Sequence, residues 1–416
     1  MDFSHSPRSS ALSTQLTRFM DDLVLPSAAE WHLHADAGGY PLDVIEPMKA
    51  QARAMGLWNL FLPSLRENQP GTRLSNVDYA PLCEIMGRVP WAAEVFNCSA
   101  PDTGNMELLQ LFATSQQRER WLDPLLAGEA RSCFAMSEPD VASSDATNIE
   151  TRIEINADDC VINGRKWFIT GAAHPLCRFV FVMGRSGDGD PHARHSVVMV
   201  PLDAPGLTVE RNIPVMDHLA PEGHCELVFR NVRVPRWHLI GEAGHGFAMG
   251  QARLGPGRVH HCMRVIGQCE LALELMCERA TERRSFGQRL ADFANIQDWI
   301  AESRMEIDQA RWHVMHAAWR MDTEGNAAAR VDVAAIKVIA ARLQTRVMDR
   351  AMQVFGAMGL SSDTPLARFW SWGRALRILD GPDEVHLRTV ARHELSLVKG
   401  RRGANTVHLR RARQHG

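Results

Sequence analysis

The chain has 416 residues, 45% of them hydrophobic, so it is long enough to bury a substantial core in two or three layers or domains. Its 46 Lys and Arg residues nearly balance 49 Asp and Glu residues, which argues against a broad electrostatic interaction with nucleic acid or an anionic membrane. No apolar run approaches the roughly 18 residues of a membrane span. Nine cysteines without a CxxC pair indicate a reducing compartment. The N-terminus lacks a secretory apolar core, so a cytoplasmic location is the default prediction.

The first third of the chain is predicted to be helical. From Thr14 to about Gly128, helix-like segments alternate with Pro, Gly and Asn breaks, while strand-like alternation is scarce. The segments include DVIEPMKAQARAM, YAPLCEIMG and MELLQLFAT. This pattern indicates a first domain made of helices.

The character changes between Ser132 and about Arg236. Short runs rich in Val, Ile and Phe are separated by turn residues, as in RFVFVMG, HSVVMVPL and CELVFRNVRV. After Gly244, long amphipathic helices are predicted, such as FANIQDWIAESRMEIDQARWHVMHAAWRM. The Arg-rich stretch RRGANTVHLRRAR near the end is predicted to be a solvated tail.

This order predicts an α+β multi-domain fold. We expect an N-terminal α-helical domain over residues 1–130 and a middle antiparallel, β-barrel-like domain over residues 131–242. A C-terminal four-helix-bundle domain should follow over residues 243–416.

Two pairs of histidines invite a metal-site interpretation, which we do not favour. His32 and His34 form an HxH spacing in WHLHADAGG, but no parallel βα pattern and no convincing further ligands accompany them. His260 and His261 are adjacent on a predicted helix and therefore point in different directions. Ordinary polar packing is the better interpretation, and no metal is predicted.

The stretch RILDGPDEVH near the C-terminus places three carboxylates around a Gly-Pro pair. Pro382 predicts a helix start, since proline is favoured at the first helical position. Asp383 and Glu384 would lie in the first turn, where carboxylates suit the helix dipole. From local sequence alone, Asp380 fits an N-cap or turn residue.

Several motifs in the right order resemble the acyl-CoA dehydrogenase family over nearly the whole chain. They are LAGEARSCFAMSEP, NGRKWFITGA, ERRSFGQRL and QVFGAMG. Within that family, RLGPGRVHHCMR, WNLFLP and LDGPDEVH are most similar to the branch that contains acyl-CoA dehydrogenase family members ten and eleven.

The resemblance implies bound FAD, whose ring needs a flat apolar cover and hydrogen bonds along its polar edge. Phe134, Met136 and Ser137 match the family strand that meets the pyrimidine edge of the flavin. Phe168 matches an aromatic residue that covers one flavin face, and Thr170 matches a hydroxyl residue near the reactive nitrogen. Without the resemblance, the same residues fit a core aromatic and an edge threonine of an ordinary strand.

Ser143 matches a family serine near the cofactor diphosphate, although DVASSD departs from the commoner GAGSD. Arg283, Ser285 and Phe286 in RRSFG resemble an element that reaches the FAD of a neighbouring subunit, and a second such element is matched by Gln353 and Gly356. The resemblance therefore implies a homodimer or homotetramer. The alternative for both segments is an ordinary helix end.

The resemblance also changes the interpretation of Asp380. The family places its catalytic carboxylate immediately before a glycine in this late loop, which here is Gly381. Some members supply the base from an earlier helix, just before the arginine that matches Arg258, but Gly257 occupies that position here. Asp380 is thus the predicted base, and Arg258 and Gly381 are predicted to contact substrate.

The implied reaction is α,β-dehydrogenation of an acyl-CoA, with electron-transfer flavoprotein as the expected electron acceptor. Asp380 would remove the α-proton while the flavin accepts a β-hydride. Two alternatives stay open. One is a flavin-dependent oxidase of the same superfamily, of the acyl-CoA or nitroalkane oxidase type, and the other is a flavoprotein subunit that has lost catalysis.

Overall fold

The first part of the chain is helical. A computed structural model describes residues 4–399. Ser6 caps the first helix, because its side chain accepts a hydrogen bond from the backbone N–H of Ser9. The helices are α1 (Pro7–Phe19), α2 (Ala28–Asp36), α3 (Leu42–Ala54), α4 (Asn76–Gly87), α5 (Ala92–Val95), α6 (Asp102–Phe112), α7 (Ser115–Gln117) and α8 (Asp123–Ala127).

A sheet follows in the middle of the chain. Its strands are β1 (Arg131–Ala135), β2 (Arg152–Ile155), β3 (Asp159–Thr170), β4 (Cys177–Arg185), β5 (His195–Pro201), β6 (Leu207–Asn212), β7 (His224–Pro235) and β8 (Leu239–Ile240). Among the described residues the strand order is β6-β7-β3-β2-β4-β5-β8, with β1 paired to β4 off this path. Most neighbours are antiparallel, as expected, but β1 and β2 each run parallel to β4.

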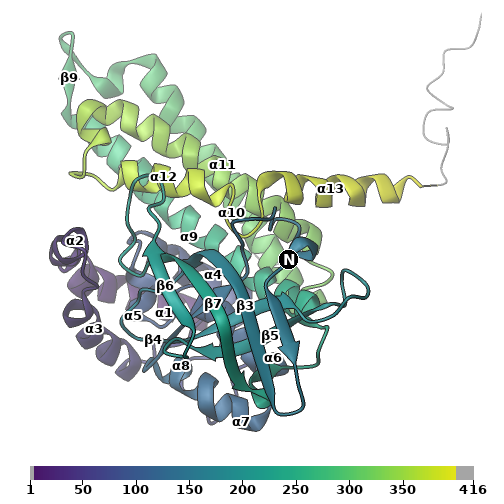
Figure 1. The fold of residues 1–416 in the computed structure, drawn as a ribbon. Coiled ribbons are helices and arrows are strands. Elements are labelled where there is room, and N and C mark those ends of the chain that lie inside the picture. Colours follow the sequence, from purple (N-terminus) through teal and green to yellow (C-terminus); the bar gives the residue numbers. More distant parts are fainter. Residues whose placement is uncertain (1–3, 400–416) are drawn as a thin grey trace, which may run out of the picture.

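The C-terminal part consists of long helices. They are α9 (Gly246–Glu282), α10 (Ala294–Glu324), α11 (Arg330–Phe355), α12 (Leu366–Leu376) and α13 (Asp383–Leu397). The first three pack on one another, and α12 and α13 pack against α11. A small hairpin of β9 (Arg284–Ser285) and β10 (Gln288–Arg289) lies at the end of these helices farthest from the sheet, while α13 projects sideways from the body (Figure 1).

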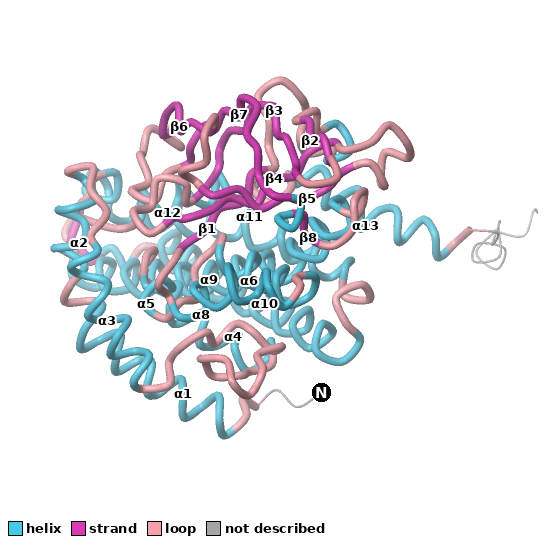
Figure 2. Tube along the Cα trace, turned by 60° about the horizontal axis from the view of Figure 1, so that its bottom comes forward, coloured by secondary structure: helices cyan, strands magenta, loops and turns pink. Residues whose placement is uncertain are grey.

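Helix α9 joins the N-terminal helices to the bundle. It crosses α4 at Gly87 and Gly267, where an added Cβ would collide with the backbone of the other helix. One hydrophobic core therefore runs from the N-terminal helices into the bundle, while a second core lies within the sheet. The sheet covers one side of the helical body (Figure 2). This arrangement brings the end of β1 close to α9.

Three further observations apply to residues 4–399. None of the helices in that range is both long and apolar enough to cross a membrane. No group of three or more His, Cys, Asp or Glu side chains there is arranged to hold a metal ion. All nine cysteines carry free thiols. The predicted Arg-rich tail lies outside the described residues.

Candidate active site

The loop that carries Asp380 has an unusual backbone. It connects the end of α12 to α13, which begins at Asp383, one residue later than the predicted start at Pro382. Asp380 has φ of 53° and Gly381 has φ of 99°, both in the left-handed region. Asp tolerates that region better than most residues, and glycine adopts it freely. A Cβ at position 381 would also lie 2.9 Å from Nε2 of His386. The turn therefore favours Asp at position 380 and glycine at position 381.

Two side chains hold the main chain of Asp380. Arg258 Nε donates to the Asp380 carbonyl oxygen at 2.9 Å, and His386 Nε2 lies 3.2 Å from the same oxygen. A carbonyl only accepts, so His386 carries its proton on Nε2. Burial, helped by the charges of Arg258 and Lys337, lowers the pKa of His386 to about 4, so the ring is neutral at pH 7. Within residues 4–399, the backbone N–H of Asp380 has no hydrogen-bond acceptor.

The carboxylate of Asp380 faces a hydrogen-bond donor, His261, and the positive charges of Lys337 and Arg258. His261 Nε2 lies 3.1 Å from its Oδ2, and the side chain keeps 29% of its surface exposed. Burial alone would raise the pKa of Asp380, but the hydrogen bond from His261 and the charges of Lys337 and Arg258 outweigh it and hold that pKa well below its usual range. Asp380 is thus ionised at neutral pH, and one side of it is open to a ligand.

His261 corrects the sequence interpretation, which assigned both adjacent histidines to ordinary polar packing. His260 does pack in the core, edge-on against Tyr79, and neither of its ring nitrogens has a hydrogen-bond partner among the described residues. His261 instead contacts the candidate base. The two rings point apart, as adjacent helical residues must, but only the tertiary structure shows which one reaches the loop.

Asp383 has a role that the sequence did not reveal. It is buried at the start of α13 and accepts from Arg377 Nε at 2.9 Å and Arg342 Nε at 3.1 Å. Both bonds converge on one oxygen, so the carboxylate fastens α13 to α11 and to the end of α12. Glu384 in the same turn is exposed. Of the three carboxylates in RILDGPDEVH, Asp383 therefore has a structural role and is not available for chemistry.

The segment after β1 is held by a buried lysine on β3. Lys166 Nζ donates to the carbonyl oxygen of Met136 at 2.9 Å and to Glu138 Oε1 at 2.8 Å. Burial, opposed by the Glu138 charge, lowers the pKa of Lys166 to about 8. The backbone N–H of Trp167 bonds to the carbonyl of Ser137 at 3.0 Å. The bond from Trp167 uses only the carbonyl oxygen of Ser137, and the N–H and hydroxyl of Ser137 have no hydrogen-bond partner within residues 4–399.

The end of β3 presents an aromatic ring and a hydroxyl. Phe168 has φ of 52° and is 40% exposed, which is unusual for a large apolar side chain with left-handed backbone. Thr170 Oγ1 lies 3.0 Å from Nδ1 of His224, whose ring stacks on Trp372 of α12 with centroids 6.5 Å apart. These contacts connect the end of β3 to the helix that leads to Asp380.

Arg253 of α9 connects the two halves of the site. Its guanidinium lies over the ring of Phe134, 4.4 Å from the centroid, and its Nε donates to Asn105 Oδ1 at 2.7 Å. Burial lowers the pKa of Arg253, and the charges of Asp380 and Glu107 oppose that shift. The structure therefore gathers Phe134, the predicted flavin strand and the Asp380 loop around α9.

Glu107 on α6 is a further buried acid near Arg253 that the sequence did not single out. Its Oε2 has no hydrogen-bond partner among the described residues. Burial raises the pKa of Glu107 to about 8, with the Arg253 charge acting in the opposite direction. The carboxyl group is thus largely protonated at neutral pH. The residues next to Glu107 in the sequence do not predict that it is buried, because they would equally suit an exposed glutamate on a helix.

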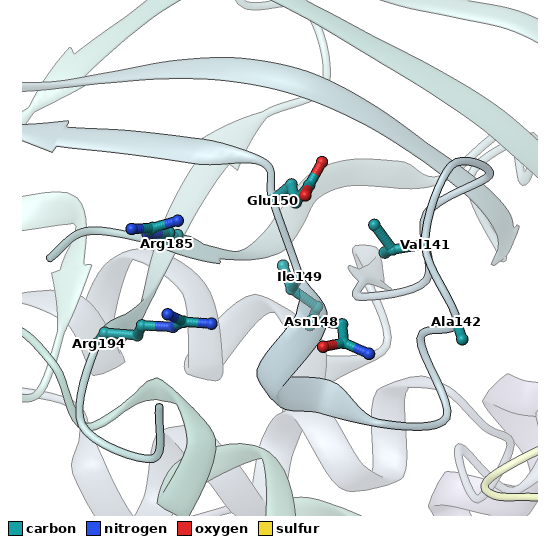
Figure 3. A pocket seen from close by; sticks show the side chains of 7 residues that line it. All are labelled: Val141, Ala142, Asn148, Ile149, Glu150, Arg185 and Arg194. Carbon is teal, nitrogen blue, oxygen red and sulfur yellow. The ribbon is translucent and has the colours of Figure 1, made fainter. Parts of the chain in front are cut away.

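Ser143 closes its own loop, because its Oγ accepts from the backbone N–H of Glu138 at 2.8 Å. A surface pocket of about 270 Å³ lies beside this loop, with Arg185 and Arg194 on the side opposite Val141 and Ala142 (Figure 3). Arg194 donates to the carbonyl of Thr147 at 2.8 Å, but its buried Nε has no partner within residues 4–399. The pocket lies outside the group around α9.

The other predicted cofactor residues lie elsewhere. Arg283 directly follows the last residue of α9, Ser285 and Phe286 belong to the hairpin, and Gln353 and Gly356 lie at the end of α11. Arg279 over the ring of Phe355, at 5.5 Å, shows that the two helix ends are adjacent. Phe286 is 97% exposed. Within one chain this tip lies away from the sheet (Figure 1).

Comparisons with known proteins agree with this fold. Models of the acyl-CoA dehydrogenase N-terminal, middle and C-terminal domains match residues 6–129, 133–232 and 244–395. A Mycobacterium tuberculosis protein named "Probable acyl-CoA dehydrogenase FadE2" is 51% identical, over 96% of this chain and 98% of its own length. Mouse acyl-CoA dehydrogenase family member 10 is 50% identical over 94% of this chain, which spans only 37% of that longer protein.

A solved structure from Mycobacterium abscessus, named as a candidate acyl-CoA dehydrogenase, superimposes with a TM-score of 0.90 at 46% identity. It covers 95% of this chain and 100% of its own. The three-domain architecture predicted from the sequence and the resemblance to this family are both confirmed.

Proposed function

This chain belongs to the acyl-CoA dehydrogenase family, and we propose from that membership that it dehydrogenates an acyl-CoA thioester to the 2-enoyl-CoA, with Asp380 as the base. The observation that carries the proposal is the conformation of Asp380. Its carbonyl is fixed by Arg258 and His386, its carboxylate is partly exposed, and its N–H is unpaired within residues 4–399.

The carboxylate and the amide of Asp380 suit two parts of the same step. The free carboxylate oxygen would take the α-proton, whose electron pair shifts toward the thioester carbonyl. The unpaired N–H would donate to that carbonyl oxygen as negative charge develops there, an interaction typically worth 10²-fold or more in rate. Both groups belong to one residue with a fixed backbone, so their relative position is set before substrate binds.

The low pKa of Asp380 in the free protein weakens it as a base, and substrate binding would correct this. A bound acyl chain excludes water from the exposed side of the carboxylate, which raises its basicity. Asp is one methylene shorter than the glutamate usual in the family. The bonds from Arg258 and His386 fix the loop that must compensate for this shorter reach.

The residues after β1 and at the end of β3 fit a flavin. Ser137 offers an unpaired N–H and hydroxyl, Phe168 offers an exposed ring face, and Thr170 offers a hydroxyl. When bound, FAD would supply the acceptor for the β-hydride. The ring of Phe168 would cover one face of the flavin, and the polar groups of Ser137 and Thr170 would orient the flavin by hydrogen bonds.

The proposed partners follow from family membership. They are an acyl-CoA substrate, electron-transfer flavoprotein as the electron acceptor, and a second copy of this chain. The hairpin with the exposed Phe286 and the end of α11 would complete the FAD site of that second copy. A role in fatty acid β-oxidation and a cytoplasmic location stay predictions.

The test is anaerobic mixing of purified, FAD-loaded protein with a panel of acyl-CoA thioesters while the flavin absorbance is followed. Bleaching by at least one thioester, with formation of the 2-enoyl-CoA, is the expected result. Failure of the whole panel to bleach the flavin would contradict the proposal.

Readmission of oxygen then separates the alternatives. A reduced flavin that oxygen reoxidises only slowly supports a dehydrogenase, whereas rapid reoxidation by oxygen, with one hydrogen peroxide formed per flavin in each turnover, supports an oxidase. Bleaching by a nitroalkane and by no thioester would place the protein with the nitroalkane oxidases, which also use an aspartate base. A flavin that no substrate reduces would indicate a subunit that has lost catalysis.

A further inference from the structure

Three side chains form a line that ends at the carboxylate of Asp380. Arg264 Nη2 lies 3.1 Å from His261 Nδ1, and His261 Nε2 lies 3.1 Å from Asp380 Oδ2. A guanidinium group donates and never accepts a hydrogen bond. His261 Nδ1 must therefore be the acceptor, which leaves the ring proton of the neutral imidazole on Nε2. The tautomer of His261 is thus set by Arg264.

We propose that His261 is a positioning residue, which donates from Nε2 to Oδ2 of Asp380 and leaves Oδ1 to take the substrate proton. This inference rests on the proposed function. It adds the group that orients the carboxylate of the base.

The arrangement also assigns where the proton goes. Arg264 occupies the lone pair of His261 Nδ1, and Nε2 already carries a proton, so the imidazole cannot accept a second one without losing the bond to Arg264. Burial lowers the pKa of His261 in addition, although the hydrogen bond to Asp380 opposes that shift. The α-proton therefore stays on Asp380 Oδ1 until it exchanges with water after product leaves.

Removal of the imidazole should change the pH dependence of catalysis in a defined direction. The donor stabilises the carboxylate, so its loss should raise the pKa of Asp380 and move the acidic limb of the rate profile to higher pH. The remaining charged or titratable groups near Asp380 stay in place in such a variant. They are Arg253, Arg258 and Cys262 on α9, Lys337 on α11 and His386 on α13.

The experiment compares three variants by rapid-mixing flavin reduction across pH. His261→Leu should slow reduction roughly 10- to 100-fold at the pH optimum of the wild type, as expected for a misplaced base, and should shift the acidic limb upward. His261→Gln can donate to Asp380 and accept from Arg264, so it should recover much of the rate. His260→Leu is the matched control, because it removes the neighbouring imidazole, and it should keep the wild-type pH profile.

An independent measurement does not depend on turnover. The midpoints of urea unfolding for His261→Leu, Asp380→Asn and the double variant form a thermodynamic cycle, and the two single effects should not add. If no thioester bleaches the wild-type flavin, the proposed function fails, and the cycle alone judges the contact. Additive effects would then overturn the inference. If wild type is active, an unchanged pH profile in His261→Leu overturns the inference while the proposed function stands.

Discussion

Arg258 binds Asp380 through the main chain and not through the carboxylate. Its Nε donates to the Asp380 carbonyl oxygen at 2.9 Å, across 122 residues of sequence. A direct ion pair would have occupied the carboxylate oxygens. The observed bond instead fixes the backbone and leaves one carboxylate oxygen for other contacts, so the positive charge helps to ionise Asp380 without covering it.

Asp380→Asn should greatly slow proton removal with little change in fold. The amide is isosteric and keeps the backbone N–H, so FAD and acyl-CoA should still bind. The rate of flavin reduction should fall about 10²- to 10⁴-fold, the usual contribution of a general base. Rapid mixing with the best substrate measures it. Asp380→Glu, which adds a methylene, should retain reduction with an altered preference among acyl chains. Near-normal reduction by the Asn variant would exclude Asp380 as the base.

Asp383→Asn should reduce stability more than it affects chemistry. The substitution removes the charge that accepts from Arg342 and Arg377, whose side chains are 41% and 37% exposed, so screening moderates the loss. We expect a decrease of about 1–3 kcal/mol in the free energy of unfolding. Urea unfolding measures it, with Glu384→Gln in the same turn as the control. Loss of flavin reduction in a folded, FAD-loaded Asp383→Asn protein would contradict this assignment.

Glu107→Gln should change how stability depends on pH. The folded state raises the pKa of Glu107 from 4.5 to about 8, so between those values the unfolded chain is ionised while the folded chain keeps its proton. The free energy of unfolding of the wild type should therefore fall as pH rises through that window.

The Gln variant lacks this penalty and should be more stable than wild type by about 2–4 kcal/mol at pH 8 and nearly equal to it at pH 4.5. Urea unfolding at both pH values measures the difference. Glu119→Gln on the exposed surface should show no such pattern. A pH-independent difference between Glu107→Gln and wild type would mean that Glu107 is ionised in the folded protein.

Arg283→Glu should lower FAD retention and weaken subunit association together. In the shared-site proposal, the substitution places negative charge near the cofactor diphosphate of a second copy, where like charges repel. Gel filtration with flavin absorbance measures both properties. Arg18→Glu reverses an exposed charge on α1 and should change neither. A stable monomer that binds FAD as tightly as the wild-type assembly would refute the shared site.

Local sequence patterns predicted those features that depend on neighbouring residues, such as the positions of helices and strands. The start of α13 differed by one residue from the prediction based on Pro382, because proline geometry acts on its neighbours. The parallel pairing of β1 with β4 was missed, because alternation of side chains does not encode strand direction. The family motifs supplied the three-domain order, which the composition of each third of the chain independently suggested.

Contacts between segments that are distant in the sequence were not predicted. His261 and His260 are equivalent in the sequence, and only the packing of α9 against the Asp380 loop separates them. Asp383 was expected to interact with the helix dipole alone, since Arg342 lies 41 residues away. Glu107 is buried by residues that are distant in the sequence, so its burial could not be predicted from its sequence neighbours. In each case the environment is made by the tertiary fold.

The 122-residue separation of Arg258 and Asp380 bears on how the protein acquires activity during folding. A contact between residues far apart in the sequence closes a long loop, which costs conformational entropy before the contact can stabilise the chain. Proteins rich in such contacts fold slowly. We expect the helices and the sheet to reach nearly native spectroscopic signals before the turn at Asp380 closes. Recovery of circular dichroism after dilution from denaturant should then precede recovery of turnover, so helix content alone would overstate the active fraction of a preparation.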